Sequence, residues 1–512
     1  MIRKILCINS VLMMLLAAAL FVYPPVRAAL DIQDPALKQG GIPKAAWRLY
    51  RNLTPRYASW ARERIAQGRA EDPPTSDISG TEWPLFGSVF YLWGIENLQA
   101  AWDAGDQGAG VEPSVYARDA IIAASELVID PRHASWVKKH WGENYLHREN
   151  VFYRMLVMAA VTSREKLLHD GAHLDLLRDQ VESFAKELEA SKTGLLDDYP
   201  GECYPGDVMA AVMCIKRADA VLGTDHSAFV NRALRGFTGA RLTRYWLPPY
   251  AASSGTGLPA SDARGCANSY MCLTAPELWP AQARQWYALY DRFFWQERVT
   301  AVGCREFAKA TPHSDWTLDV DAGPVIAGYG VAANAFGVGA ARKNGRFDRA
   351  YPLAAEMLAT VGELPNGMLA APRLLSNLSD APMLGEAGIL WQLSIQPETG
   401  VPVQTGGSIP AYVYIVLIIA LLFGVWRILE SVLTFREARR AAEEPAAYAP
   451  RFQVFLWACL LVGAIAAFSL GHGLIEVATL IASIFLPILK RKKALKGTEG
   501  WPDEGAAPSA KP

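Results

Sequence analysis

Six short polar clusters lie within the first 400 residues of the chain, and each runs directly into a segment rich in apolar or small residues. The clusters occupy residues 81–83, 147–150, 202–207, 266–270, 319–323 and 385–388. More ordinary amphipathic segments separate them, so the sequence alternates between two kinds of helix. Six inner helices whose N-termini gather at one end would enclose a barrel with polar groups at its mouth. The pattern therefore predicts an all-α fold, an (α/α)6 barrel of six inner and six outer helices.

The periodicity of apolar residues separates the two kinds of helix. In the expected outer helix that begins near residue 174, the apolar residues recur every three or four positions, as in a helix with one buried stripe. They are Leu177, Val181, Phe184 and Leu188. Segments 117–129 and 347–361 have the same pattern. Segments 86–102, 151–161, 208–215 and 325–341 carry few charges and are apolar or small on most sides, which is typical of core helices. No segment alternates as a β-strand does over a useful length.

Both ends of the chain are apolar. Residues 1–28 have a basic start, an apolar run and a small-residue end, which predict a signal peptide or, alternatively, an uncleaved N-terminal anchor. Three apolar segments near the C-terminus are separated or followed by basic residues, and such residues mark the cytoplasmic side. We expect an exported domain at 29–405, a transmembrane helix at 409–433, a cytoplasmic loop at 434–451, a transmembrane hairpin at 452–490 and a disordered cytoplasmic tail at 491–512. This topology predicts a bacterial inner-membrane protein whose main domain is periplasmic or extracellular.

Charge and cysteine content exclude several classes of function. The net charge is −1 and the main domain has no long basic stretch, so nothing favours a nucleic-acid partner. Five of the seven cysteines lie in the exported region, and of these Cys266 and Cys272 flank an expected turn and can pair. His133, His140 and His147 recur every seven residues, but Gly142 interrupts any helix that would align them. We therefore expect no metal and no cofactor.

The densest polar segment spans residues 197–207 and contains four carboxylates, two tyrosines, two prolines and a cysteine. Its two Pro-Gly turns stiffen the loop, and Asp207 can cap the helix that follows. A capped helix after a solvated acidic turn is the structural alternative. We favour a site in which Glu202 and Asp207 are catalytic. The expected substrate contacts from this loop are Tyr199, Cys203 and Tyr204.

A second polar segment, residues 316–324, places two aspartates before a helix built from Gly, Ala and Val. Carboxylates at a helix N-terminus feel its positive dipole and stay ionised. One of Asp319 and Asp321 is expected to cap the helix, and the other is a candidate general base. Trp316, at the start of the segment, is a candidate surface for stacking on a sugar ring.

Two more acidic residues and three tyrosines complete the candidate site. Glu149 is a catalytic candidate, although a pairing with Arg148 or a neighbouring loop would explain it equally well. The remaining candidates for substrate contact, each of which can also be explained by packing, are Glu82, Tyr145, Tyr153 and Tyr270. The chain has no HExxH, paired CxxC, GxSxG, Walker or Rossmann motif. With these motifs absent, the sequence favours acid–base chemistry by carboxylates and tyrosines.

With these motifs, the exported domain resembles the linalool dehydratase/isomerase family, which folds as an (α/α)6 barrel. The resemblance is carried by residues 149–153, 202–207, 222–225, 319–342 and 344–345 and extends loosely over 45–395. It implies chemistry that removes or adds water at a terpene alcohol, with cysteines, a histidine, a tyrosine and acidic groups in the barrel.

The chain departs from that family in its cysteines and its histidine. Cys203 is displaced, Asp207 occupies the place of the second cysteine, and Met155 and Leu156 stand where the histidine is expected. We therefore expect this chain to share the fold of that family but not its dehydratase activity.

Three functions follow from these observations. The first is a membrane-anchored, periplasm-facing hydrolase or lyase that uses carboxylates on a hydroxylated substrate, a glycan or glycolipid. The second is a lyase or isomerase for a terpenoid alcohol, which a small apolar pocket would favour. The third is a non-catalytic module that binds a glycan or a partner in a membrane complex, which an open mouth without converging carboxylates would favour.

Overall fold

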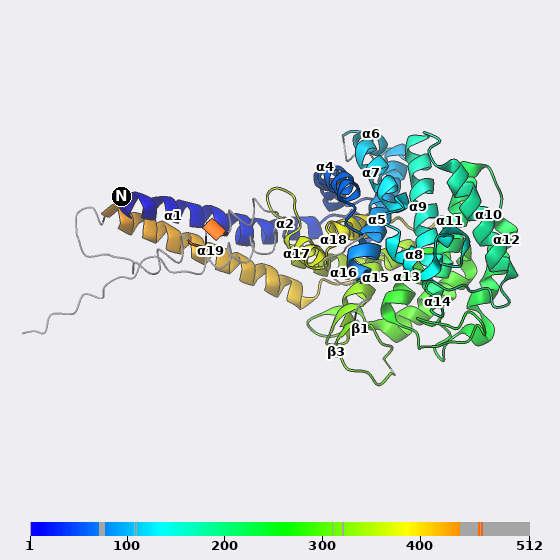
Figure 1. The fold of residues 1–512 in the computed structure, drawn as a ribbon. Helices are drawn as coiled ribbons and strands as arrows, with labels where there is room; N and C mark the ends of the chain where they lie inside the picture. The colour runs from blue at the N-terminus through cyan, green and yellow to red at the C-terminus, as the bar shows by residue number, and fades with distance from the viewer. Residues whose placement is uncertain are drawn as a thin grey trace, which may run out of the picture. The chain divides into compact units, whose positions relative to one another are not determined.

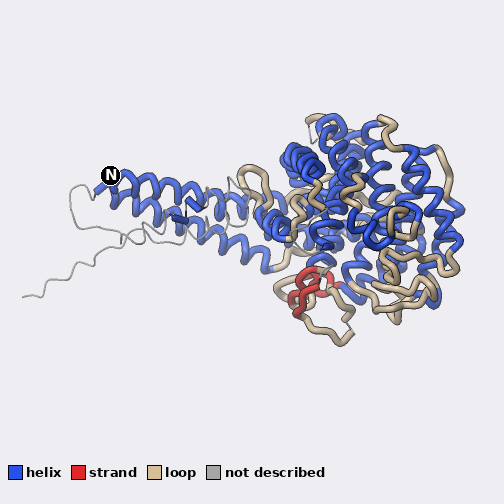
Figure 2. The backbone as a smooth tube through the Cα atoms, in the orientation of Figure 1, coloured by secondary structure: helices blue, strands red, loops and turns tan. Residues whose placement is uncertain are grey.

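The structure is a computed structural model and describes residues 2–70, 77–106, 108, 110–309, 311–319, 322–440, 459–460 and 462–463. Its internal contacts divide the chain into two units, Ala19–Leu422 and the combination of Met1–Ala18 with Phe423–Pro512. The described residues are mostly helical and contain little sheet (Figure 2). The candidate site lies entirely within the unit Ala19–Leu422.

Six helices of that unit contact one another in chain order, and the last contacts the first (Figure 1). They are α5 (Asp77–Asp103), α9 (Val151–Leu168), α11 (Pro205–Leu222), α13 (Gly265–Leu278), α15 (Val331–Lys343) and α18 (Leu384–Ser394). Fourteen consecutive residues of α9, from Val151 to Arg164, are buried, so this helix is in contact with neighbours on all sides. The sequence of α9 has no polar face, as expected for a helix that is buried around its whole circumference.

Further helices pack against these six. They are α4 (Lys44–Gln67), α7 (Arg118–Ile129), α10 (Leu174–Ala190), α12 (Ser227–Ala233), α14 (Pro280–Phe294), α16 (Phe347–Val361) and α17 (Ala370–Leu378). Helix α10 contacts α9 and α11, α14 contacts α13, and α16 contacts α15. The apolar stripe predicted for α10 is confirmed, because Leu177, Val181 and Phe184 are fully buried. The bounds of α16 coincide with the predicted segment.

Short elements connect these helices. The α-helices among them are α2 (Tyr23–Ile32), α3 (Ala36–Gln39), α6 (Pro113–Tyr116) and α8 (Ser135–Trp141). Three 3-10 turns lie at Tyr145–His147, Leu234–Phe237 and Gly239–Arg241.

Five short strands were not expected from the sequence. Strand β1 (Trp295–Glu297) pairs antiparallel with β2 (Val302–Cys304), and β3 (Trp316–Asp319) pairs with β4 (Gly323–Ile326), which pairs with β5 (Tyr329–Gly330). The helix predicted from residue 325 therefore begins only at Val331. Gly323, Ala327 and Gly328 have positive φ values of 67°, 52° and 86°. Such left-handed residues belong to turns, so this stretch forms a hairpin before the helix begins.

Two helices are long and apolar enough to cross a membrane, judged by length and composition: Cys7–Ile32 and Ala411–Arg440. The first begins at Cys7 within α1 (Ile2–Ala17) and continues through a π-helical turn (Ala18–Val22) and α2; the second is α19. Helix α19 continues unbroken to Arg440, so the segment predicted as a loop from residue 434 begins as helix. The predicted hairpin and tail lie outside the described residues, except for helical residues 459–460 and 462–463.

Candidate active site

The acidic loop before α11 is held by its own backbone. The Asp198 amide donates to the Glu202 carbonyl over 2.8 Å, and the Glu202 amide donates to the Tyr199 carbonyl over 2.8 Å. Gly201, with φ 86°, provides the left-handed residue that the turn requires. The Asp197 carboxylate accepts the Gly201 amide over 2.8 Å. Of the two predicted Pro-Gly turns, the one at Pro200-Gly201 is present and orders the loop. The second prediction is wrong, because Pro205 and Gly206 begin α11.

Asp198 is the acid of this loop with the lowest solvent exposure among those whose side chains are buried. Its side chain is buried, and one carboxyl oxygen accepts the Tyr204 amide over 2.9 Å. The Phe152 amide is a second backbone donor near this carboxyl. Burial raises the pKa of Asp198 well above its ordinary value, and the charges of Asp207 and Glu82 raise it further; the amides of Tyr204 and Phe152 oppose the shift. Asp198 is therefore held in a position that favours its protonated form.

Glu82 reaches the same place from the N-terminal part of α5. Its carboxylate accepts a hydrogen bond from the Tyr199 hydroxyl, across 117 residues of sequence. The Tyr199 ring also packs against Trp136 and His140, with centroids 6.0 and 5.0 Å away. Of the predicted contacts, Glu82 and Tyr199 are thus brought to the loop that carries Asp198.

Tyr270 lies deeper between the helices, in the second turn of α13. It is 5% exposed, and its hydroxyl makes no hydrogen bond to any residue that the structure describes. Burial and the nearby charge of Asp207 raise the pKa of this hydroxyl well above its usual value. The charge of Asp207 therefore acts on two buried polar groups, Asp198 and Tyr270.

Aromatic rings from five of the six contacting helices meet beside Tyr270. They are Phe86 and Phe90 of α5, Phe152 of α9, Tyr270 of α13, Phe336 of α15 and Trp391 of α18. The Tyr270 ring centroid lies 5.9 Å from that of Phe86 and 5.4 Å from that of Phe336. Phe86 and Phe336 retain partial solvent exposure. This aromatic wall gives the acidic groups an apolar surface on one side.

An ion-pair cluster binds the strands to α13. The Arg264 Nε donates to Glu306 over 2.8 Å, and its Nη2 lies 3.0 Å from an Asp319 carboxylate oxygen. Glu306 is fully buried and also accepts the Cys266 thiol over 3.1 Å. The Arg264 guanidinium lies 4.4 Å from the Tyr250 ring centroid. The predicted position of Asp319 at a helix N-terminus is therefore wrong, because Asp319 ends a strand and is held by Arg264.

Other predictions for this region also need correction. Asp207 lies inside the first turn of α11 and does not cap it, because the helix begins at Pro205 and Tyr204 is at the cap position. Cys266 and Cys272 are free thiols within the same helix, which holds them too far apart along its axis to pair. Asp321 lies outside the described residues.

Three further candidates lie outside the acidic loop. Trp316 is 68% exposed, on β3. Tyr145 and Tyr153 are buried with their ring centroids 5.7 Å apart, and the Tyr153 hydroxyl donates to the Val128 carbonyl over 3.0 Å. These two tyrosines have the packing role that was the alternative explanation.

The remaining members of the acidic loop have local partners. Glu202 is exposed and accepts the Tyr204 hydroxyl over 2.9 Å. Glu149 accepts the Asp197 amide over 2.6 Å, and burial raises the pKa of Glu149. Burial and surrounding carboxylates raise the pKa of the Cys203 thiol, so Cys203 is held as a neutral thiol.

Histidines and acidic groups are not grouped as metal ligands in the described ranges of the chain. His133 is buried against Asp130 at 2.9 Å, and His147 is exposed beside Asp179 at 3.1 Å. His133 and His147, two of the three histidines spaced seven residues apart, therefore each have a carboxylate partner.

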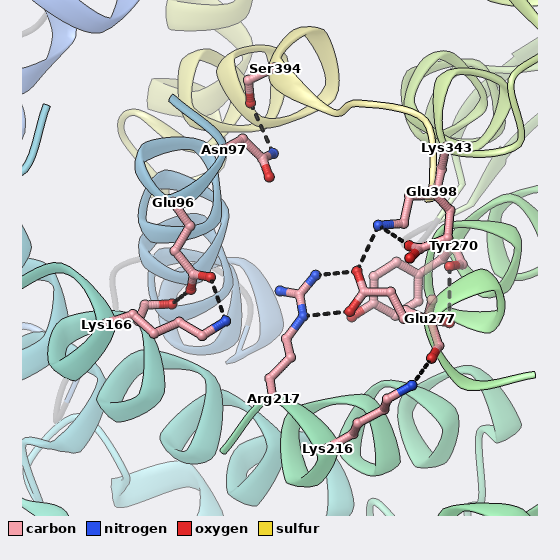
Figure 3. A network of polar contacts seen from close by, with 12 residues as sticks. Glu96, Asn97, Lys166, Lys216, Arg217, Tyr270, Glu277, Lys343, Ser394 and Glu398 are labelled. Atoms are coloured by element: carbon pink, nitrogen blue, oxygen red, sulfur yellow. Dashed lines mark hydrogen bonds and ion pairs between the residues drawn. The ribbon is translucent and has the colours of Figure 1, made fainter. Parts of the chain in front are cut away.

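The opposite ends of the same six helices carry polar groups that satisfy one another (Figure 3). Arg217 donates to both Glu277 oxygens at 2.8 and 2.6 Å, and Lys343 lies 2.9 Å from Glu277. Lys166 lies 3.3 Å from Glu96. These charges are paired across neighbouring helices, whereas the buried Asp198 carboxyl at the other end has no cationic side chain among the causes of its pKa shift. The N-terminal end is therefore the better candidate for a site.

Sequence reasoning identified the acidic loop but did not select Asp198 within it, and it missed Arg264, Glu306 and Tyr250. The signal for Asp198 was its place in an acidic pair beside the first Pro-Gly turn, but the pattern does not show which carboxyl meets the charges of Asp207 and Glu82. Arg264 precedes a cluster that the sequence did single out, and Glu306 lies in a segment without a pattern.

No protein-family model matches this chain, and no curated protein matches it either. Function is therefore argued from the residues and geometry of the chain itself.

Proposed function

We propose that residues 29–405 form an (α/α)6 barrel and act as a membrane-anchored, periplasm-facing enzyme. Its substrate is a hydroxylated molecule, a glycan or glycolipid, in which it cleaves a carbon–oxygen bond by hydrolysis or elimination. The barrel is supported by the contacts of six helices in chain order, from α5 to α18 and back to α5. The anchoring is supported by the two helices that are long and apolar enough to span a membrane.

The observation that carries this proposal is the buried Asp198 carboxyl, which lies in the loop that Glu82 reaches through its hydrogen bond from Tyr199. The charges of Asp207 and Glu82 act on this carboxyl and raise its pKa further. A carboxyl that stays protonated near neutral pH can donate a proton to a departing oxygen. Two like charges at close range disfavour ionisation of both groups, so one of the neighbouring acids holds the proton while the other is a carboxylate. We assign proton donation to Asp198. Asp207 is assigned to assist water or to remove a proton.

Tyr270 and the aromatic wall have supporting roles in this proposal. The Tyr270 hydroxyl can donate to, or accept from, a substrate hydroxyl, which would satisfy a buried polar group that otherwise has no partner. The partly exposed Phe86 and Phe336 rings offer an apolar face for a sugar ring. Glu202 and Asp319, the acids first expected to be catalytic with Asp207, are instead exposed or ion-paired.

A lyase or isomerase for a terpenoid alcohol is the second candidate. The specific observation in its favour is the aromatic wall, since an apolar hydrocarbon body would also bury against Phe86, Phe336 and Trp391. The same acidic groups would then protonate or deprotonate the alcohol. A binding module without catalysis has less support, because it gives no role to the raised pKa of the Asp198 carboxyl.

The test uses the full chain in detergent micelles with Asp198→Asn, which keeps the side-chain shape and removes the acid. Asp175→Asn, on the exposed face of α10, is the matched control. Reducing-end release is measured from a panel of glycans, and water loss from a terpenoid alcohol. We expect Asp198→Asn to lower glycan turnover by about 10²–10⁴-fold, the range for loss of a general acid, and Asp175→Asn to leave it unchanged.

Two results would redirect the assignment. Full activity of Asp198→Asn would exclude it as the acid. Turnover of the terpenoid alcohol alone would establish the second candidate, and glycan binding without any turnover would indicate the binding module.

A further inference from the structure

We propose that the basic end of the two membrane helices binds an anionic glycerophospholipid, whose phosphate is held by Arg436, Arg439 and Arg440. This lipid site lies in the unit that combines Met1–Ala18 with Phe423–Pro512. It is separate from the acidic loop and independent of the proposed chemistry. It requires that α1 and α19 lie in a membrane, and that α1 stays on the mature chain as an anchor.

A groove with a volume of about 500 Å³ is lined by residues of both α1 and α19. This volume falls within the range of about 300–1,000 Å³ that is typical of ligand sites. The polar lining consists of Ser10, Ser431, Arg436, Arg439 and Arg440, and none of the described residues that line the groove is acidic. The lining therefore favours a ligand that carries negative charge.

The three arginines at the end of α19 are available to such a ligand. Arg436, Arg439 and Arg440 are three or four positions apart, so they share one face of the helix. All three are exposed, and none of them forms an ion pair with a residue that the structure describes. Arg427, in contrast, is paired with Glu430. Arginine holds phosphate through two parallel hydrogen bonds, which makes a phosphate group the anion that this face fits.

The rest of the groove is apolar, and this part distinguishes a phospholipid from a free phosphate. Val11 and Met14 of α1 line it together with Val432 and Phe435 of α19. On α19 these apolar residues precede the arginines, toward the interior of the candidate span. A free phosphate would fill only the basic end of the groove. A phospholipid places its charge at the arginines and its hydrocarbon along the apolar part.

The ends of both candidate spans favour a leaflet that contains anionic lipids. Arg3 and Lys4 precede the first span in the sequence, and the three arginines end the second. Basic residues that flank a span favour the cytoplasmic side, and the cytoplasmic leaflet carries the anionic phospholipids. The groove is therefore expected at the level of anionic headgroups.

The experiment measures lipid binding to the full chain in detergent micelles by native mass spectrometry. The probes are phosphatidylglycerol and phosphatidylcholine with identical acyl chains, which differ in net charge. Each arginine near an anionic lipid surface raises binding about fivefold. Because water and salt screen part of this effect, we expect phosphatidylglycerol to bind about tenfold more tightly or better.

A triple variant removes the basic end of the groove. In Arg436→Gln with Arg439→Gln and Arg440→Gln, the preference should fall to about twofold or less. The matched control removes the same charge from exposed positions outside both spans, through Arg178→Gln, Lys186→Gln and Lys192→Gln, and should keep the preference.

A second measurement needs no substitution, because basic residues also orient a helix in the membrane and the triple variant can fail to insert. Phosphatidylglycerol with a diazirine in its acyl chain is photolysed on the native chain in the presence of excess phosphatidylcholine. We expect cross-links at Val11, Met14, Val432 or Phe435. Glycerol 3-phosphate, which has the charge without the acyl chains, should not displace the lipid.

Several results would overturn the lipid site. They are equal binding of the two lipids, a preference that survives loss of the arginines, cross-links confined to other segments, and displacement by glycerol 3-phosphate. A purified chain whose mass lacks residues 1–28 would overturn it as well, because the groove needs α1. The enzymatic function is measured by turnover, so its failure is distinguishable from each of these results.

Discussion

Substitution of Glu277 by Gln tests whether the paired charges at the C-terminal ends of the six helices stabilise their packing. Glu277, on α13, accepts two hydrogen bonds from Arg217 of α11 and pairs with Lys343 of α15. The amide keeps the shape but leaves Arg217 and Lys343 without this counter-charge. Removing one partner of a buried pair costs about 3–5 kcal/mol. The side chains of Glu277 and Arg217 are 17% and 22% exposed, so water screens part of their interaction. We therefore expect Glu277→Gln to lower the free energy of unfolding by about 2–3 kcal/mol.

The assay is thermal unfolding of the full chain in detergent micelles. Unfolding entropy is about 2.1 cal/mol/K per residue, so for a unit of roughly 400 residues this loss lowers the Tm by about 2–4 °C. Glu182→Gln, on the exposed face of α10, is the matched control and should leave the Tm unchanged.

The pH dependence provides an independent check of the same pair. Although burial opposes ionisation, the charges of Arg217 and Lys343 lower the pKa of Glu277. A carboxyl with a depressed native pKa stabilises the fold above its unfolded pKa of about 4.3, and this stabilisation is lost as the pH falls through the native pKa. The Tm gap between native protein and Glu277→Gln should therefore shrink below about pH 4. An unchanged Tm at neutral pH, or a gap that persists in acid, would refute the role given to this pair.

Two further substitutions test the candidate site and the packing beside it. Because the native pKa of Asp198 is raised, its contribution to stability is complete below its unfolded pKa of about 3.9 and declines as the pH rises through the native value. Asp198→Asn should thus gain stability over the native protein as the pH increases from 4 to 9, and a Tm difference that does not change with pH would contradict the raised pKa. For Gly265→Ala, the added Cβ would lie 2.0 Å from the Arg305 carbonyl oxygen, so we expect a loss of about 1–3 kcal/mol. Gly206→Ala, whose Cβ meets only ordinary contacts at 3.8 Å, is the matched control and should be neutral in the same denaturation experiment.

The sequence by itself determined most of the helices. Whether a residue of α10 or α16 faces the core follows from its spacing of three and four positions, which is a local property of the chain. The same holds for α9, whose lack of a polar face predicted its burial on all sides. The Pro-Gly turn of the acidic loop was equally local, because Gly201 supplies its left-handed backbone without help from distant residues.

Only the tertiary structure decided which acids have unusual properties. Burial together with the charges of Asp207 and Glu82 raises the pKa of Asp198, and Glu82 lies more than 100 residues away in the sequence. Asp319 was assigned to a helix N-terminus from its neighbours, but a hairpin and Arg264 hold it instead. A hydrogen-bond partner or a neighbouring charge comes from whichever segment packs against the residue. Periodicity in a single sequence determines which face of a helix is buried, and the fold determines which distant group that face meets.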